Sequence, residues 1–333
     1  MIVRPRLLWP LLATPALAQA RPADRLQSAL HTAGSAANDI ASIWWVMLTG
    51  AVVIFVFVMA LVLVGILRPR PSVPARLFIV GGGIVFPVVT LTLLLIYSVR
   101  VGAGIAAPPP DGTLVVEVTG HMWWWDVRYA GEPGSRLVTA NELRIPVGRP
   151  VQLRVRSEDV IHSFWVPNLA GKIDMIPGRT NVITLQADEP GIYRGQCAEF
   201  CGLQHTQMAL HVVAEEAGLW DAWFARQSQP AIAVDRFLTP RQQQGREVFV
   251  EVGCGSCHAI RGLSDPPPGT APDLTHIGSR PSLGAGMLPN TVGHLAAWIA
   301  GSQSIKPGNR MPSFHTLDGP SLTALADFLS AQK

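Results

Sequence analysis

Residues 196–210 read QCAEFCGLQHTQMAL, which places two cysteines, a histidine and a methionine close together in the chain. A further histidine, His162, precedes them in the sequence IHSFWVP. Thiolates, imidazoles and a thioether are soft to borderline ligands, and such a set suits copper first and zinc second. A structural Cys₂His₂ zinc site usually has a close pair of histidines after its cysteines. Because His162 lies upstream of both cysteines, the pattern favours copper.

The two cysteines stand on one tight loop, so both sulfurs can bridge two metal ions. Each ion can then take one histidine, with the methionine capping one ion and a backbone carbonyl of the loop capping the other. The predicted ligands are His162, Cys197, Glu199 through its carbonyl, Cys201, His205 and Met208. A site that spreads its charge over two coppers and has no open position serves one-electron transfer and not substrate binding.

The segment around this loop contains short β-favouring runs separated by Gly, Pro and Asn turns, which predicts an antiparallel β-sandwich or barrel. The expected strands cover residues 114–118, 123–129, 151–155, 181–185 and 208–213. A short helix is expected over residues 219–226, and a linker over residues 227–238.

Two apolar stretches precede the β-rich segment. Residues 41–67 and 77–99 contain no charged side chain, and each exceeds the roughly 20 residues that cross a bilayer as a helix. The loop between them carries Arg68, Arg70 and Arg76 and no acidic residue, so the positive-inside rule predicts that it is cytoplasmic. The chain after about residue 100 then lies on the outer side of the membrane.

The first 20 residues combine Arg4 and Arg6 with a short apolar stretch and the small-residue pattern Ala18-Gln19-Ala20. We interpret them as a secretory signal peptide, with a third membrane anchor as the alternative. The whole chain of 333 residues is 48% hydrophobic and 15% charged, which argues against a purely soluble or a disordered protein. Its 26 basic and 23 acidic residues show no strong basic excess, so no nucleic-acid partner is expected.

The other two cysteines form the sequence Cys254-Gly-Ser-Cys257-His258, the pattern of covalently attached c-type haem. The alternative, a thioredoxin-like Cys-x-x-Cys, lacks the following histidine and needs a βαβ pattern that is not found here. The thiols would bind the haem vinyl groups, and His258 would bind the iron. This domain resembles class I cytochrome c, in which a Met-Pro loop before the last helix supplies the second ligand, here Met311. The other candidates are Met287, His276, His294 and His315.

The chain from the first apolar stretch to about residue 226 resembles subunit II of haem–copper cytochrome c oxidases. The likeness rests on GHMWWW (120–125), SEDVIH (157–162), KIDMIPG (172–178) and GQCAEFCG (195–202). With the haem domain added, the whole chain looks like subunit II of a caa-type oxidase with its electron donor fused on.

This resemblance implies a multidomain membrane protein. Its parts would be a two-helix transmembrane hairpin, a cupredoxin-like β-barrel with a binuclear copper A centre, and an all-α class I cytochrome c domain. The expected boundaries are 1–20 for the signal peptide, 21–105 for the hairpin, 106–226 for the copper domain, 227–238 for the linker and 239–333 for the haem domain. In the haem domain, helices over 241–251 and 322–331 are expected to cross through Gly245, Phe249, Leu325 and Phe328.

The resemblance also implies roles that the residue types alone do not give. The six copper ligands carry over by position, the Glu199 carboxylate is expected to bind a magnesium ion shared with subunit I, and Trp123 is expected to receive electrons. A soluble cytochrome c or similar donor would reduce haem c, which would reduce copper A and then subunit I, where O₂ becomes water. Family members often place a glutamate at a proton channel near the start of the second span, but residues 77–86 contain no acid.

The implied partners are subunit I, the other oxidase subunits and membrane lipid. The implied location is the bacterial inner membrane, crossed twice, with the redox domains on the periplasmic side. A copper A subunit of a related terminal reductase, such as a nitric oxide reductase, fits nearly as well. Soluble nitrous oxide reductase is disfavoured, because its second copper cluster needs more clustered histidines than the nine here supply. A membrane copper chaperone would need neither Met208 nor a haem.

Overall fold

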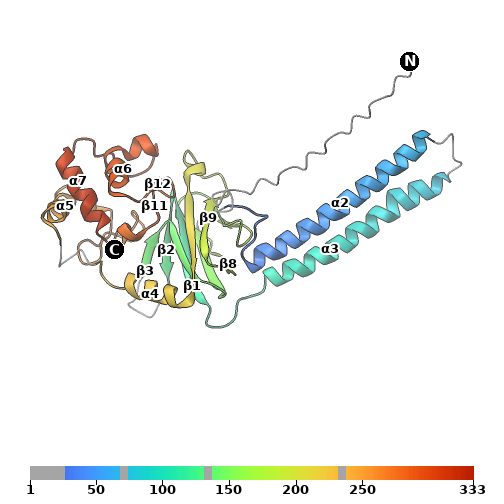
Figure 1. The fold of residues 1–333 in the computed structure, drawn as a ribbon, viewed down its shortest axis with the longest axis horizontal. Helices are drawn as coiled ribbons and strands as arrows, with labels where there is room; N and C mark the ends of the chain where they lie inside the picture. Colours follow the sequence, from blue (N-terminus) through green and yellow to red (C-terminus); the bar gives the residue numbers. More distant parts are fainter. Residues whose placement is uncertain (1–26, 68–73, 131–136, 232–237) are drawn as a thin grey trace, which may run out of the picture.

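The computed structural model describes residues 27–67, 74–130, 137–231 and 238–333. The predictions for residues 1–20, for Arg68 and Arg70, and for residues 232–237 of the linker lie outside these ranges. The chain forms a helical hairpin, a β-domain and a helical C-terminal domain, in that order along the sequence (Figure 1). The predicted three-part fold class is therefore confirmed.

The hairpin is long and extends away from the β-domain (Figure 1). Helix α2 (Ser35–Leu67) is followed by a π-helical segment, η1 (Leu77–Val85), that continues into α3 (Phe86–Ile105). These helices of 33 and 29 residues are long and apolar enough to cross a membrane. The hydroxyl groups of Ser42 and Tyr97 lie 3.0 Å apart and join the two helices. Most of the large apolar side chains of the hairpin are exposed, as expected for a surface that contacts lipid or other membrane helices.

The start of α2 is attached to the β-domain. The Ala33 amide donates to the Asn168 carbonyl at 2.8 Å. A Cβ atom at Gly34 would lie 2.3 Å from the carbonyl oxygen of Gln186, so only glycine fits at this contact. The segment that leads into α2 is therefore packed directly against the β-domain.

The β-domain consists of two five-stranded sheets, with the orders β3-β2-β1-β5-β8 and β4-β10-β9-β6-β7. The strands are β1 (Leu114–His121), β2 (Trp124–Tyr129), β3 (Leu137–Ala140), β4 (Glu142–Pro146), β5 (Val151–Ser157), β6 (His162–Trp165), β7 (Ile173–Met175), β8 (Asn181–Leu185), β9 (Gly191–Cys197) and β10 (Ala209–Glu215). The inward side chains of β5, Val151, Leu153 and Val155, alternate with outward polar ones and are fully buried in the core between the sheets. Helix α4 (Ala217–Gln227) covers one end of the domain and buries Trp220 and Trp223.

Two strand pairs in this domain are parallel, namely β1 with β5 and β4 with β10. The prediction of a wholly antiparallel domain was wrong for these pairs. Parallel neighbours need a long crossover connection, and here each crossover includes strands of the other sheet. The short turns between predicted strands could not reveal that exchange.

The C-terminal domain is built from α5 (Pro240–Glu251), α6 (Val292–Ile305) and α7 (Gly319–Ser330), with a small hairpin of β11 (Ser282–Leu283) and β12 (Leu288–Pro289). Helices α5 and α7 cross in close contact, because a Cβ atom at Gly245 would lie 2.0 Å from the Ala324 carbonyl oxygen. The rings of Phe249 and Phe328 lie 6.0 Å apart across the same contact. The predicted crossing of the terminal helices is confirmed.

Candidate metal centres

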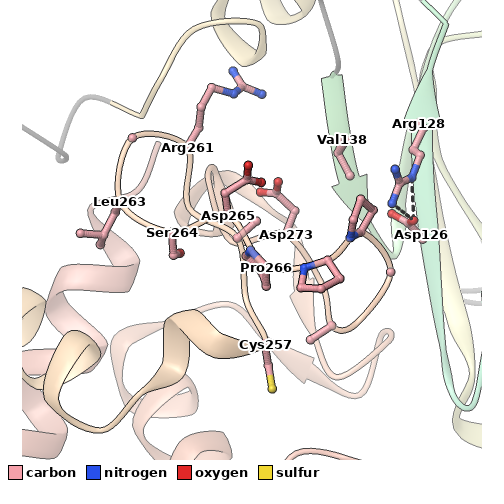
Figure 2. Close-up of a pocket in the computed structure, with 16 residues that line it drawn as sticks. Asp126, Arg128, Val138, Cys257, Arg261, Leu263, Ser264, Asp265, Pro266 and Asp273 are labelled. Atoms are coloured by element: carbon pink, nitrogen blue, oxygen red, sulfur yellow. Dashed lines mark hydrogen bonds and ion pairs between the residues drawn. The ribbon is translucent and has the colours of Figure 1, made fainter.

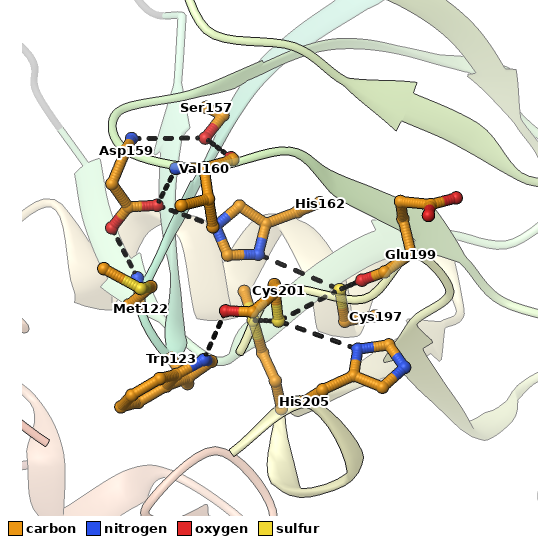
Figure 3. Close-up of polar contacts among 11 residues, drawn as sticks. Met122, Trp123, Ser157, Asp159, Val160, His162, Cys197, Glu199, Cys201 and His205 are labelled. Carbon is orange, nitrogen blue, oxygen red and sulfur yellow. Dashed lines mark hydrogen bonds and ion pairs between the residues drawn. The ribbon is translucent and has the colours of Figure 1, made fainter. Parts of the chain in front are cut away.

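The predicted copper ligands gather at one end of the second sheet (Figure 3). His162 begins β6, and Cys197 ends the neighbouring strand β9. The loop after β9 carries Cys201 and then His205, which opens the short 3₁₀ helix η2 (His205–Gln207), and Met208 follows directly before β10. Pairing of β6 and β10 with β9 therefore brings His162 and Met208 to the cysteine loop.

The two sulfurs are close without being bonded to each other. Cys197 Sγ and Cys201 Sγ lie 3.7 Å apart, well beyond the roughly 2.05 Å of a disulfide bond. Each sulfur has its own histidine: His162 Nδ1 lies 3.8 Å from Cys197 Sγ, and His205 Nδ1 lies 3.6 Å from Cys201 Sγ. Two sulfurs in the middle with one imidazole at each side is the arrangement that two bridged metal ions require.

The predicted caps lie on the two sides of this pair. Met208 Sδ lies 3.9 Å from Cys201 Sγ, and the Glu199 carbonyl oxygen lies 3.1 Å from Cys197 Sγ. The sulfurs and Met208 are buried, so water is largely excluded from the site. The soft donor set, its duplication and its burial all fit a binuclear copper centre.

The carboxylate of Glu199 takes no part in this cluster. It is exposed and points away from the sulfurs (Figure 3). Within the described part of the chain, the group of side chains close enough to hold a metal ion is His162, Cys197 and Cys201. A magnesium ion on Glu199 would therefore need further ligands from outside this cluster.

The cysteine pair is electrostatically uneven. The hydrogen bond between the sulfurs lowers the pKa of Cys197 and raises the pKa of Cys201. Cys197 therefore loses its proton more readily than Cys201, and a bound cation would displace the proton of the second thiol.

Asp159 orients the histidine ligand of Cys197. Its Oδ1 atom lies 2.8 Å from His162 Nε2, which leaves Nδ1 directed at the sulfur. Burial alone would lower the pKa of His162, but hydrogen bonds with Asp159 and Cys197 raise it on balance. Asp159 was not among the residues predicted from the sequence, although a carboxylate three residues before a predicted histidine ligand was an available signal. Asp159 also accepts a hydrogen bond from the Met122 amide at 2.7 Å, next to Trp123.

The predicted haem site lies in the C-terminal domain. Cys254 begins the 3₁₀ segment η4 (Cys254–Ser256), and Cys257 and His258 follow it. His258 Nδ1 lies 2.8 Å from the Pro272 carbonyl oxygen, which fixes the ring and leaves Nε2 for a metal. Burial lowers the pKa of His258, so its imidazole is neutral at pH 7, the form that binds iron.

Met311 is well placed among the candidates for the second axial ligand. Its side chain is partly buried against the core of the haem domain, as is that of Cys254. Its amide donates to Asn309 Oδ1 at 2.8 Å, which holds the loop in place. His276 is engaged elsewhere, with Nε2 3.0 Å from the Gln229 carbonyl oxygen, and His294 Nδ1 lies 2.8 Å from Thr291 Oγ1 at the start of α6. These residues fit a covalent haem with histidine and methionine ligands, and Met311 remains the prediction.

A pocket lies beside Cys257, between the loop that follows the cysteines and the first sheet of the copper domain (Figure 2). Its walls include Pro266 on the haem side and Asp126, Arg128 and Val138 on the copper side. The two domains are thus in contact next to the point of haem attachment.

Trp123 lies between the two sites. Its indole Nε1 donates to the Cys201 carbonyl oxygen at 2.8 Å, so the ring is joined to a predicted copper ligand. The side chain is only 9% exposed. A Cβ atom at Gly308 would lie 3.7 Å from the ring, which shows that the loop before Met311 covers the indole.

Comparison with known proteins assigns both domains to families. The family described as cytochrome c oxidase subunit II, periplasmic domain, matches residues 130–215, and the cytochrome c family matches residues 242–333. The chain is 38% identical over 256 residues to cytochrome c oxidase subunit 2 of Alkalihalophilus pseudofirmus, an overlap that spans 75% of this chain and 71% of the relative. This chain belongs to the cytochrome c oxidase subunit 2 family. The resemblance inferred from the sequence is therefore confirmed.

Other relatives of this oxidase subunit are more distant. The subunit of Bacillus subtilis is 30% identical over 266 residues, an overlap that spans 75% of this chain and 73% of the relative. The solved periplasmic domain of subunit II of cytochrome oxidase from Bradyrhizobium japonicum is 28% identical and covers 36% of this chain and 96% of its own length, with a TM-score of 0.34. The chain is therefore an oxidase subunit II that also carries a cytochrome c domain.

Proposed function

We propose that this oxidase subunit takes electrons into its C-terminal haem domain and passes them through its copper domain to subunit I, where O₂ is reduced to water. The observation that carries the proposal is the position of Trp123. Its ring is hydrogen-bonded to the Cys201 carbonyl on one side and covered by the loop that precedes Met311 on the other. One side chain thus contacts elements of both redox sites.

The residues proposed to hold copper A are His162, Cys197, Cys201, His205, Met208 and the carbonyl of Glu199. Those proposed to hold haem c are Cys254, Cys257, His258 and Met311. When bound, these two groups supply reversible one-electron transfer. The chain orients these ligands and keeps water away from the sulfurs. Asp159 fixes the ring of His162, Pro272 fixes the ring of His258, and the buried end of β9 and the loop after it hold the two sulfurs. We also keep the Glu199 carboxylate as a magnesium ligand shared with subunit I, supported by its exposure and its direction away from the sulfurs.

The burial of Trp123 supports a particular route for external electrons. A soluble cytochrome c cannot reach an indole that the haem domain already covers. The soluble donor would therefore deliver its electron to the haem domain and not to the copper domain.

The location and partners follow from the hairpin. Two long apolar helices and the arginines between them support a two-pass protein of the bacterial inner membrane with both redox domains on the periplasmic side. The exposed apolar faces of the hairpin support packing against subunit I, other oxidase subunits and lipid. We keep the domain boundaries 21–105, 106–226, 227–238 and 239–333 as proposals.

The proposal is tested on the purified membrane complex by total copper and iron, an optical spectrum and gas consumption. We expect two coppers and one c-type haem for each copy of this chain, and O₂ uptake when a reduced soluble donor is added. Uptake of nitric oxide without uptake of O₂ would instead assign the chain to a related terminal reductase. Copper binding without a c-type haem, or without electron transfer, would contradict the proposal.

A further inference from the structure

The side chain of Lys306 is buried at the boundary between the haem domain and the copper domain. Lys306 directly follows α6 and is only 3% exposed. Its ammonium donates to the carbonyl oxygens of Trp123 at 2.8 Å, Gln207 at 2.8 Å and Gly284 at 3.0 Å. All three donors of the ammonium are therefore used.

A lysine is an expensive residue to bury, because its charge leaves water. Within the described ranges no carboxylate pairs with Lys306, and burial lowers the pKa of its amine to about 7. The three carbonyls are what compensates for the lost hydration. An interaction made only of fixed backbone oxygens specifies geometry, since none of the acceptors can move without its strand or loop.

The three acceptors belong to segments that matter for electron transfer. Trp123 contacts the carbonyl of Cys201, and Gln207 directly precedes Met208. Gly284 lies in the turn between β11 and β12 of the haem domain. Lys306 thus joins the tryptophan, the loop of the predicted copper ligands and a second segment of its own domain.

The residues after Lys306 continue the same contact. The carbonyl oxygen of Pro307 accepts a hydrogen bond from Gln204 Nε2 at 2.7 Å, and Gly308 lies against the Trp123 ring. Asn309 Nδ2 donates to the Lys306 carbonyl at 2.7 Å, and Asn309 Oδ1 accepts from the Met311 amide at 2.8 Å. The predicted axial ligand is therefore linked to Lys306 through one short, internally bonded loop.

We infer that Lys306 is a positioning residue that fixes the haem domain on the copper domain with the Met311 loop against Trp123. The inference rests on the proposed function, in which electrons cross this boundary. With this contact, the haem domain stays docked on the copper domain in a single orientation. A haem domain held only by its linker would instead bind to the copper domain and dissociate from it repeatedly.

The first test compares Lys306→Met with the matched control Lys333→Met in the purified oxidase complex. Lys333 belongs to the same domain, and its side chain is exposed. A methionine side chain is similar in length to that of lysine but donates no hydrogen bond. We expect Lys306→Met to raise amide hydrogen exchange in peptides that cover residues 203–209 and 282–289, where the Ala209 amide donates to the Ala285 carbonyl across the boundary. The control should exchange like the wild type.

In the same variants we then measure the rate at which the haem domain reduces the copper domain. Loss of hydrogen bonds from a charged group should lower the docked fraction, and with it the rate, by about tenfold or more. Optical and electron paramagnetic resonance spectra must show both metal centres intact in Lys306→Met. Wild-type exchange together with a wild-type rate in Lys306→Met would overturn the inference.

A second test needs no variant and decides the matter if Lys306→Met does not accumulate. Buried contacts are screened little by salt, whereas docking by exposed charges weakens as the Debye length falls from about 20 Å to a few ångströms. The wild-type transfer rate should therefore stay constant from about 20 mM to about 500 mM salt. A rate that falls steadily with salt would overturn the inference. If the wild type shows no transfer at all, the proposed function fails, while the exchange experiment still tests the docking by Lys306.

Discussion

Cys197 and Cys201 are the residues on which the candidate copper site depends most. Their sulfurs lie 3.7 Å apart, and each has a separate imidazole at 3.6–3.8 Å. A thiolate bridges two coppers covalently, whereas a hydroxyl oxygen is a harder and poorer bridge. The two sulfurs should therefore be indispensable, while a cap at the edge of the site should be replaceable.

Replacing Cys197 by Ser should abolish the paramagnetic resonance pattern of an electron shared between two coppers. The matched change in a cap, Met208→Leu, should keep both coppers and shift only their potential. Resonance spectra and copper content of the two purified variants check this. A shared-electron pattern that survives in Cys197→Ser would refute the bridging role.

Trp123 contacts elements of both sites, and Trp124 is its natural control. Trp123→Ala removes the hydrogen bond to Cys201 and the ring that Gly308 covers, so transfer between the domains should slow by about tenfold or more. Trp124, which stacks on His121 with ring centroids 4.4 Å apart, should tolerate the same change far better. Stopped-flow rates with both metal centres intact check the difference. Equal rates in the two variants would show that Trp123 has no special role.

The residues of the copper site differ in how far the sequence could predict them. Five of the six predicted ligands stand within residues 197–208, so spacing and ligand chemistry were enough to propose them as one site. Asp159 and Lys306 were not foreseen. Asp159 acts through a histidine, and Lys306 binds backbone carbonyls as far as 183 residues away along the chain, which no local pattern records.

At the scale of elements, the close crossing of α5 and α7 gives the sharpest stability prediction. A Cβ atom at Gly245 would lie 2.0 Å from the Ala324 carbonyl, so Gly245→Ala must push the helices apart at a cost of about 1–3 kcal/mol or more. Gly293 in α6 has no atom within 4 Å of the corresponding position, and Gly293→Ala should stabilise the helix slightly. Thermal unfolding followed at the haem absorbance checks both. A wild-type melting temperature in Gly245→Ala would contradict the crossing.

The loop that contains Met311 is predicted to supply the second axial ligand of the haem iron. Met311→Ala should remove the sulfur-to-iron charge-transfer band and lower the haem potential, because a methionine ligand favours ferrous iron. Met287→Ala should change neither, since among the described residues the hydrophobic side chains packed on the haem-domain core include Met311 but not Met287. Optical spectra and redox titration of both variants check this. The opposite result would assign the iron to Met287.

The strands of the copper domain differ in how well the sequence predicts them. Strand β8 has the expected bounds of residues 181–185, because it is a run of strand-favouring β-branched residues, Val182-Ile183-Thr184. Strands β6 and β7 have only four and three residues, too few to show a period. Strand β9 (Gly191–Cys197) contains two glycines, which are poor strand formers, yet its neighbours on both sides pair with it.

At the scale of the whole molecule, the sequence predicted three parts and their order but not how the last two lie together. Apolar runs and Cys-containing motifs define the parts locally. Their contact depends on groups that any residue offers, such as the Ala285 carbonyl that accepts from the Ala209 amide at 3.1 Å. Ser282 Oγ and His211 Nδ1 lie 3.2 Å apart at the same boundary. The structure therefore adds a defined docking of donor on acceptor to the tether expected from the sequence.

In the proposed function the haem domain and the copper domain of one chain exchange electrons with each other. A short tether alone gives an effective concentration on the order of mM, and the contacts of Trp123 and Lys306 fix the orientation as well. The most direct measurement is the rate at which the haem domain reduces the copper domain in the purified complex, followed by stopped flow over a wide range of enzyme concentrations. We expect a first-order step whose rate constant does not change with enzyme concentration. A rate that rises in proportion to enzyme concentration would show that electrons pass between complexes, and it would contradict transfer within one chain.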